Sequence, residues 1–420
     1  MNKLAYGALW LFVFAISSEP TFRGFGILIT GITGPPALGL ALLAFGVSGR
    51  LRRWHLFHVA ALLFLIWIVI GLVFVYNRWI EIPNKFWTYI QLFLVLWMIW
   101  ELAATRSRQI GLMVAYLLGA YIAAIDTIIL YRRQAEVLRR FAAGGVDNND
   151  LAMMLALGIP IAWYLATTYR QPLRRWICSA YLPIALFAIG LTGSRGGMIT
   201  TMICLLIVPL TMIRLSPTRR AAAIILMCLS GAVAVTYIPE TLIERLASTR
   251  MEVEGGRLGG RWKLWNAGFR AFMLKPVAGY GPGQFKKAID PLLIARSQVA
   301  HNSFLSVLVE QGIVGLLLFS TMFFTILLGI LKLPPAERRF ALVLFVALGM
   351  SMMPLSSEEN KRVWFMLALL LGLTQARFVG AGGILSRTPH GRAPLPAAAG
   401  ARRREPLTAP VRTIDRNASA

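Results

Sequence analysis

Long apolar runs separated by short polar segments dominate the sequence. Most of the runs are about 20 residues long, which is the length at which an α-helix crosses the hydrocarbon core of a bilayer. They predict twelve membrane-spanning helices near residues 4–18, 26–47, 55–76, 86–104, 109–131, 151–169, 177–193, 197–214, 221–239, 312–332, 339–356 and 361–379. The pattern therefore predicts an all-α polytopic membrane protein.

These helices divide the chain into four predicted regions. The regions are residues 1–239 with spans one to nine, residues 240–311 as one large loop domain, residues 312–380 with the last three spans, and residues 381–420 as a tail. The sequence of the loop predicts short helices, because aromatic residues recur at helical spacing from Arg261 to Met273 before Pro276 ends the pattern. The tail is rich in Arg, Pro, Ala and Gly without apolar periodicity, which predicts a disordered basic segment in the cytoplasm.

Composition and charge agree with a membrane protein and predict its orientation. Hydrophobic residues make up 57% of the chain and the mean hydropathy is +0.65, whereas soluble domains are ~45–50% apolar. The formal net charge is +25. Short connections on one side of the predicted membrane are basic and nearly free of acids, so the positive-inside rule predicts that both termini are cytoplasmic. Further spans follow the first run at once, which favours a retained helix over a cleaved signal peptide.

Several classes of function lack support in the sequence. Cys178, Cys204 and Cys228 lie within apolar spans without the spacing of a disulfide framework or metal site, and they are predicted core residues. The chain has no Walker loop, no Rossmann glycine pattern and no Gly-x-Ser-x-Gly elbow. Few acids lie within the spans, which argues against a transporter driven by protons or sodium.

His301 is the candidate for acid–base chemistry. Of the four histidines, His55 and His58 open a span and His390 lies in the tail, whereas His301 ends an arginine-rich loop directly before Asn302. Imidazole titrates near neutral pH and is the side chain that most often accepts a proton in enzymes. The structural alternative is a helix-capping or hydrogen-bonded loop histidine.

Arginines next to glycines or at a helix start are candidates for phosphate binding. Arg195 stands in a Gly-Ser-Arg-Gly-Gly turn between two spans, and Arg261 begins the predicted loop helix. A guanidinium binds phosphate oxygens through parallel hydrogen bonds and stays charged, and glycines let a phosphate approach the backbone. Arg270, on the same helix, is a weaker candidate. The alternative for Arg195 is an interfacial arginine whose head reaches the lipid headgroups.

The stretch Asp147-Asn148-Asn149-Asp150 precedes the sixth predicted span. Asx residues before a helix usually cap its first turn, although the same groups could bind sugar hydroxyls. The stretch lacks the further carboxylates that a calcium loop requires, so no metal site is expected here.

Four motifs, taken in order, resemble the O-antigen ligase and polymerase superfamily of bacterial envelope enzymes. They are Asn149-Asp150-Leu151-Ala152 before a span, Ser194-Arg195-Gly196 after a span, Arg261 with Leu264-Trp265 leading to Pro276 and the glycines of residues 279–283, and His301-Asn302 followed by Gly312 and Gly315. Each motif is weak alone, but the ordered set and the layout of spans over residues 1–380 are fairly specific. The resemblance implies a glycosyltransferase of the GT-C type in the bacterial inner membrane, active on the periplasmic face and similar to WaaL-type O-antigen ligases.

The resemblance also implies partners and residue roles. Such ligases transfer O-antigen from undecaprenyl pyrophosphate to a sugar hydroxyl of lipid A-core, with membrane lipids as further partners, and without nucleic acid, nucleotide sugar, metal or cofactor. His301 would be the catalytic base of an inverting displacement. The pyrophosphate-binding residues would be Arg195, Arg261 and Arg270. The possible substrate-binding residues are Asn302, Arg257, Lys275, Tyr280, Gln284, Asn149, Asp150, Arg139 and Arg140.

Two alternative functions stay open on the sequence. An O-antigen polymerase would use the same residues to join two lipid-linked chains, and the long basic loop favours the phosphate-bearing acceptor of a ligase. A transporter or flippase, from a different class, could bind an anionic lipid-linked substrate in a basic outer vestibule. Matching broken helices in the two halves would favour transport, and no internal repeat is visible.

Overall fold

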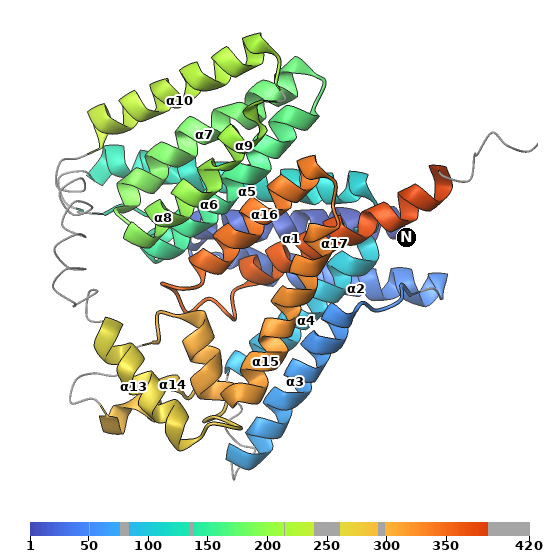
Figure 1. Ribbon diagram of the computed structural model, residues 1–420, viewed down its shortest axis with the longest axis vertical. Coiled ribbons are helices and arrows are strands. Elements are labelled where there is room, and N and C mark those ends of the chain that lie inside the picture. The colour runs from blue at the N-terminus through green and yellow to red at the C-terminus, as the bar shows by residue number, and fades with distance from the viewer. Residues whose placement is uncertain are drawn as a thin grey trace, which may run out of the picture. The chain divides into compact units, whose positions relative to one another are not determined.

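The computed structural model describes residues 1–49, 51–75, 84–134, 138, 140–213, 215–238, 261–292 and 299–384. Residues Met1–Phe378 form one compact unit. Every regular element in the described part is helical (Figure 1). The predicted tail from residue 385 onward lies outside the described residues, so its disorder stays a prediction.

The helices follow one another along the chain with short connections. They are α1 (Asn2–Arg23), α2 (Ile29–Ser48), α3 (Leu56–Val75), α4 (Asn84–Leu102), α5 (Arg106–Gln134), η1 (Ala143–Gly145), α6 (Asn148–Thr168), α7 (Pro172–Thr192), α8 (Arg195–Leu205), α9 (Ile207–Met212), α10 (Pro217–Tyr237), α13 (Arg261–Leu274), α14 (Phe285–Ile289), η3 (Asp290–Leu292), α15 (Ser303–Leu331), α16 (Pro335–Ser351) and α17 (Lys361–Ile384).

Each of the twelve predicted spans falls on one of these helices, with α8 and α9 sharing a single span. Seven stretches of the described chain are long and apolar enough to cross a membrane, namely α2, α3, α5, α6, α7, α8 with α9, and α15. The prediction of an all-α polytopic membrane protein is confirmed.

The predicted span 197–214 is interrupted, because the helix breaks between Leu205 and Ile207. Pro209 explains the break. Proline has no amide hydrogen and its ring clashes with the carbonyl four residues earlier, which here belongs to Leu205. The two pieces still form one candidate span, Arg195–Met212, with Arg195 at its start.

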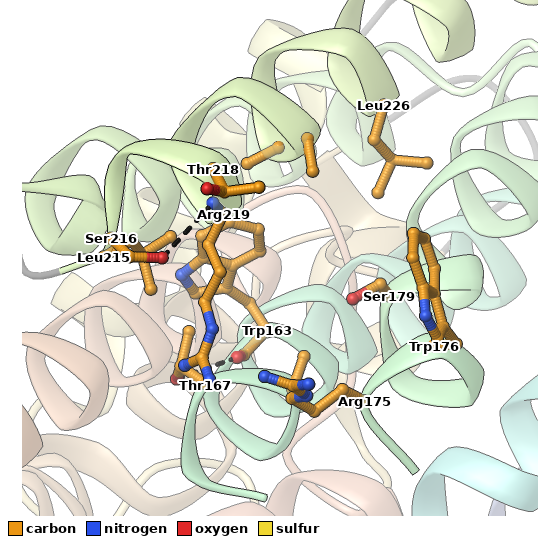
Figure 2. A pocket seen from close by; sticks show the side chains of 13 residues that line it. Trp163, Thr167, Arg175, Trp176, Ser179, Leu215, Ser216, Thr218, Arg219 and Leu226 are labelled. Atoms are coloured by element: carbon orange, nitrogen blue, oxygen red, sulfur yellow. Dashed lines mark hydrogen bonds between the residues drawn. The ribbon is translucent and has the colours of Figure 1, made fainter. Parts of the chain in front are cut away.

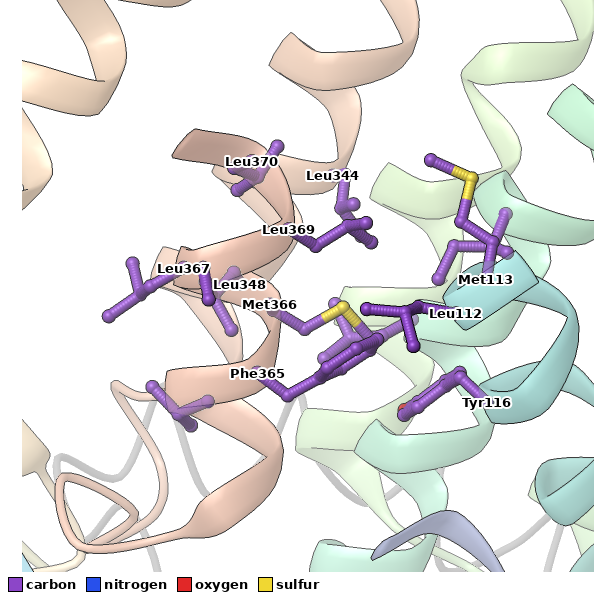
Figure 3. Close-up of a cluster of buried hydrophobic side chains, with 14 of the residues drawn as sticks. Leu112, Met113, Tyr116, Leu344, Leu348, Phe365, Met366, Leu367, Leu369 and Leu370 are labelled. Atoms are coloured by element: carbon purple, nitrogen blue, oxygen red, sulfur yellow. The ribbon is translucent and has the colours of Figure 1, made fainter. Parts of the chain in front are cut away.

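The core of this unit centres on α6. Within its apolar window 89% of α6 is buried, against 22% for α2, so α6 is surrounded by protein. Figure 3 shows Tyr116 of α5 lying against Phe365 of α17, and their rings stack with centroids 5.4 Å apart. The Tyr116 hydroxyl donates a hydrogen bond to the Met154 carbonyl of α6 at 2.8 Å, which satisfies a polar atom inside the apolar core. Tyr116 thus joins α5, α6 and α17 inside the core.

The cysteine prediction is correct for two residues and wrong for the third. Cys178 and Cys204 are buried free cysteines, whereas Cys228 is exposed. Cys228 lies on α10, which packs against α7 at the edge of the helical array and leaves its other face uncovered (Figure 1).

Helices α13 and α14 and the first turns of α15 share a smaller apolar core of their own. The predicted loop helix from Arg261 is confirmed as α13. The Trp265 indole donates a hydrogen bond to the Ala300 carbonyl at 3.1 Å, which fixes α13 next to the segment before α15.

The predicted glycine turn of residues 279–283 docks onto a kink in α15. The Gly281 amide donates to the Glu310 carbonyl at 2.7 Å. Two residues later α15 bends at Gly312, whose φ of 66° lies in the left-handed region that favours glycine. A side chain at Gly312 would meet the Val277 carbonyl. The span predicted to begin at residue 312 therefore begins nine residues earlier, at Ser303, and only bends at this glycine.

Candidate active site

The capping residues of α6 and α8 tie the starts of these two helices together. The Asp147 carboxylate accepts hydrogen bonds from the amides of Asn149 and Asp150 at 2.8 and 3.2 Å. The Ser194 hydroxyl, at the cap of α8, donates to the side-chain carbonyl of Asn149 at 2.8 Å. The predicted capping role of this Asx stretch is confirmed. Arg195, the first residue of α8, is consequently held beside the start of α6.

Arg140 approaches the same place from the connection before α6. Its Nε donates a hydrogen bond at 2.7 Å to the carbonyl of Thr192, the last residue of α7. Arg140 thus lies close to the turn that carries Arg195. The other arginine predicted in this connection, Arg139, lies outside the described residues.

Arg261 brings a further guanidinium to these helix starts. Burial lowers the pKa of Arg261, the Asp147 carboxylate partly restores it, and Arg195 lowers it again. The interaction between two charges weakens with the distance that separates them, so groups that perturb one another lie near one another. The fold therefore brings Arg195, Arg261 and Asp147 together.

His301 belongs to the same group of residues. Burial lowers the pKa of the imidazole, Arg261 lowers it further, and Asp147 partly restores it. His301 has a φ of 46°, the only left-handed backbone among the non-glycine residues that the structure describes, which is uncommon for a residue with a side chain. It stands immediately before Asn302, which caps α15. The capping alternative is therefore wrong for His301.

The cationic cluster consists of Arg195, Arg261, His301 and Asp147. Each lies at, or within two residues of, the start of a different helix: α8, α13, α15 and α6 respectively. Helix starts expose unpaired amides and carry partial positive charge, which favours bound anions. Two guanidiniums beside these amides suit a doubly charged phosphate, and a largely neutral imidazole next to it can accept a proton.

Arg270 and Lys275 are not brought to the cationic cluster. Arg270 follows Arg261 by about two and a half helical turns, which places the two on opposite faces of α13 and ~13 Å apart along its axis. Arg270 is exposed. The Lys275 ammonium instead lies 4.7 Å from the centre of the Tyr280 ring, a cation–π contact within the turn that docks on α15.

The remaining predicted substrate-binding residues have structural contacts or fall outside the described part. The Asn302 side chain accepts from the amides of Phe304 and Leu305 at 3.0 and 3.1 Å. Gln284 stands at the cap position of α14. Arg257 lies outside the described residues. Substrate contacts of these side chains stay predictions.

Asp150 also has a partner that the sequence did not suggest. Its carboxylate forms an ion pair with Arg362 of α17 at 2.6 Å, and Arg362 donates a second hydrogen bond to the Asp150 carbonyl at 3.2 Å. The contact fastens the start of α6 to the start of α17. In the described part of the chain, no three His, Cys, Asp or Glu side chains gather closely enough to hold a metal ion.

A buried ion network of Lys85, Glu310 and Glu358 was missed by sequence reasoning. The Lys85 ammonium lies 2.6 Å from Glu358 Oε1 and 3.0 Å from Glu310 Oε2. The Ser306 hydroxyl donates to Glu358 Oε1 at 2.6 Å. Each charge is isolated in its own segment, so only folding joins them. One signal was present, because Ser303, Ser306 and Glu310 recur at helical spacing ahead of an apolar run.

The network holds the first turns of α15, the helix that follows His301. Ser303 adds to this hold, since its hydroxyl donates to the Leu355 carbonyl at 2.8 Å and accepts from the Ser357 amide at 2.8 Å. Glu310 also accepts from the Gly283 amide at 3.0 Å. The start of α15 is thus fixed by the segment before α17 and by the glycine turn.

The apolar helices define the class of multi-pass membrane proteins. The family model described as O-Antigen ligase matches residues 180–320, from within α7 to within α15. The matched stretch contains Arg195, Arg261 and His301. The resemblance to the O-antigen ligase and polymerase superfamily that the sequence suggested is confirmed over this stretch. No match was found among curated proteins.

Proposed function

We propose that this protein is an O-antigen ligase, which transfers O-antigen polysaccharide from undecaprenyl pyrophosphate to a sugar hydroxyl of lipid A-core during lipopolysaccharide assembly. The observation that carries the proposal is the convergence of Arg195, Arg261 and His301 from three separate segments into one cationic cluster. The match of residues 180–320 to the O-antigen ligase family model supports polysaccharide transfer. Arg140 at the edge of the cluster favours an acceptor that bears phosphates.

The two arginines would bind the pyrophosphate of the donor. As the bond between the anomeric carbon and the phosphate oxygen breaks, the leaving undecaprenyl pyrophosphate takes the electron pair and gains negative charge. Guanidiniums already aimed at that position stabilise this charge without having to reorganise, and a single such donor contributes roughly 10²–10³ in rate. Because Arg195 and Arg261 each stand at the start of a helix, whose free amides favour a bound anion, they would act together on the leaving group.

His301 would take the proton from the acceptor hydroxyl as its oxygen attacks the anomeric carbon. The lowered pKa keeps the imidazole neutral and ready to accept this proton. Asp147 then favours the imidazolium that forms, because its carboxylate is the group that raises the pKa of His301. Attack opposite the leaving group in one displacement would invert the anomeric carbon.

The membrane placement that fits this reaction has twelve spans, both termini in the cytoplasm and a GT-C type of architecture in the bacterial inner membrane. The basic short connections support that orientation through the positive-inside rule. It puts the starts of α6 and α8, and with them the cationic cluster, on the periplasmic side.

The proposal is tested with purified components: the protein in nanodiscs, lipid-linked O-antigen and lipid A-core, with and without a chelator. The wild type should form ligated product in both conditions. His301→Ala should lower the rate by about 10²–10⁴ while donor binding stays close to that of the wild type. His390→Ala, in the predicted tail, serves as the matched control and should keep full activity.

Other outcomes contradict the proposal in distinct ways. Equal product from His301→Ala would remove the imidazole from the chemistry. Elongated lipid-linked chains without ligated product would identify a polymerase instead. Movement of the donor between leaflets without any transfer, unaffected by His301→Ala, would identify a transporter.

A further inference from the structure

A second basic site lies at the opposite end of the α6–α7 helix pair. The cationic cluster adjoins the start of α6 and the end of α7, whereas this pocket adjoins the end of α6 and the start of α7. With 1.5 Å of rise per residue, each helix is ~31 Å long, which is the thickness of the bilayer core. The pocket and the cationic cluster therefore face opposite leaflets.

The pocket is a cavity of about 400 Å³ between α6, α7 and α10. Its lining includes two arginines, Arg175 and Arg219, and the hydroxyls of Ser179 and Thr218. No carboxylate among the described residues forms an ion pair with either arginine. As far as the described residues go, the pocket thus offers positive charge without an ion-pair partner, and hydroxyl donors, to a ligand.

Two helix starts add to this positive charge. Both α7 and α10 begin with a proline beside the pocket, and Arg175 and Arg219 lie in their first turns. The cap residue of α7, Gln171, forms no side-chain hydrogen bond to the helix amides. At α10 the Arg219 amide already donates to the Ser216 hydroxyl at 3.4 Å, so the amides suited to a phosphate group are those of α7.

The other side of the pocket is apolar. Figure 2 shows the guanidinium groups of Arg175 and Arg219 at one side, with Trp176 and Leu226 at the other. The Trp176 side chain is 66% exposed, and tryptophan is enriched where a membrane protein meets the lipid interface. A free phosphate ion would leave this apolar wall uncovered, whereas a phospholipid would cover it with the upper part of an acyl chain.

We propose that this pocket binds the phosphate headgroup of an anionic membrane phospholipid from the leaflet opposite the cationic cluster. The two guanidiniums and the first-turn amides of α7 hold the phosphate, and Trp176 and Leu226 contact the acyl chain. An anionic headgroup also neutralises part of the basic face formed by the connections around Arg170 and Arg219.

The test compares bound phosphatidylglycerol on the wild type and on Arg175→Gln/Arg219→Gln. Both proteins are released from nanodiscs of phosphatidylglycerol and phosphatidylcholine and examined by native mass spectrometry. Arg170→Gln/Arg174→Gln is the matched control, because it removes the same charge from exposed positions that do not line the pocket. We expect the pocket variant to lose one tightly bound phosphatidylglycerol, with about 30-fold weaker affinity for two lost phosphate contacts. The control should keep it.

The same samples distinguish a lipid site from a site for a free anion and from a folding defect. Ligation activity and thermal stability should stay near wild type in the pocket variant, which would show that it folds. Equal lipid retention by the pocket variant, or equal loss by the control, would overturn the site. If millimolar inorganic phosphate displaced the retained lipid as well as excess phosphatidylglycerol does, the pocket would be an anion site and the lipid assignment would be wrong.

Discussion

The two ends of the α6–α7 pair carry similar basic elements in different surroundings. The cationic cluster and the opposite pocket each combine two arginines with helix starts. At the cluster Arg261 and His301 are half-buried and a carboxylate, Asp147, stands among them. In the pocket Arg219 is exposed, and the described lining contains neither an imidazole nor a carboxylate.

Binding a phosphate group and transferring a proton require different groups. Arginines and helix starts are sufficient to bind a phosphate group, so both ends can hold an anion. Proton transfer needs a group that changes charge near neutral pH, and of the two ends only the cationic cluster has one. Burial matters too, because desolvation at the cluster strengthens electrostatic effects that water would screen at the exposed pocket.

The largest effect is expected from the buried ion network, which has no counterpart at the pocket. Lys85→Met leaves the Glu310 and Glu358 carboxylates buried without their cation, and breaking such a pair costs about 3–5 kcal/mol. Thermal unfolding of the purified protein should show a clear loss of stability. Glu337→Gln, which breaks a more exposed pair with Arg106 at 3.6 Å, should cost at most about 1 kcal/mol. Similar losses in both variants would contradict the role of the network.

The next effect is on catalysis at the cationic cluster. Arg261→Lys keeps the charge but removes the planar pair of donors, and we expect ligation to fall by roughly 10²–10³. Arg270→Lys on the opposite face of the same helix, and Arg219→Lys in the pocket, should both stay near wild-type activity. The measurement is the initial rate of ligation with purified substrates. An equal fall in the Arg270 variant would show that the two faces of α13 are not distinct in function.

A smaller effect is expected at the cap of α15. Asn302→Ala removes two hydrogen bonds to helix amides and should cost ~1 kcal/mol of stability. The loss of these two hydrogen bonds also loosens the backbone next to His301, so the ligation rate should fall. Asn302→Ser restores a capping oxygen and should recover both quantities. Recovery of stability without recovery of rate would instead indicate that the Asn302 side chain contacts substrate.

The smallest effect is a shift in the dependence of ligation on pH. The base must be neutral, so the acid limb of the rate should lie below the usual pKa of histidine, because burial and Arg261 lower the pKa of His301. Asp147 raises that pKa, so Asp147→Asn should move the acid limb to lower pH, and asparagine still caps α6. A limb that moved to higher pH, or did not move, would argue against His301 as the titrating base. Pocket variants should leave the profile unchanged.

Much of the fold could be predicted from the sequence because each membrane span is a continuous run of apolar residues. The twelve predicted ranges all fall on helices, and the helix from Arg261 and the turn at residues 279–283 are where the pattern put them. The boundaries that failed depend on local geometry. Pro209 breaks a run that is apolar throughout, and Asn302 starts α15 before its apolar part begins.

For the site, the sequence by itself determined which residue types could do chemistry: one loop histidine and arginines beside glycines or at a helix start. It ranked Arg261 above Arg270 from the position of Arg261 at the helix start, but only the packing of α13 decides which face meets Asp147. The tertiary structure alone brought together Lys85, Glu310 and Glu358, and it alone formed the pocket around Arg175 and Arg219. The physical reason is range. An apolar run consists of residues that are neighbours in the sequence. The partners of a buried charge are distant in the sequence, and only the folded chain brings them together.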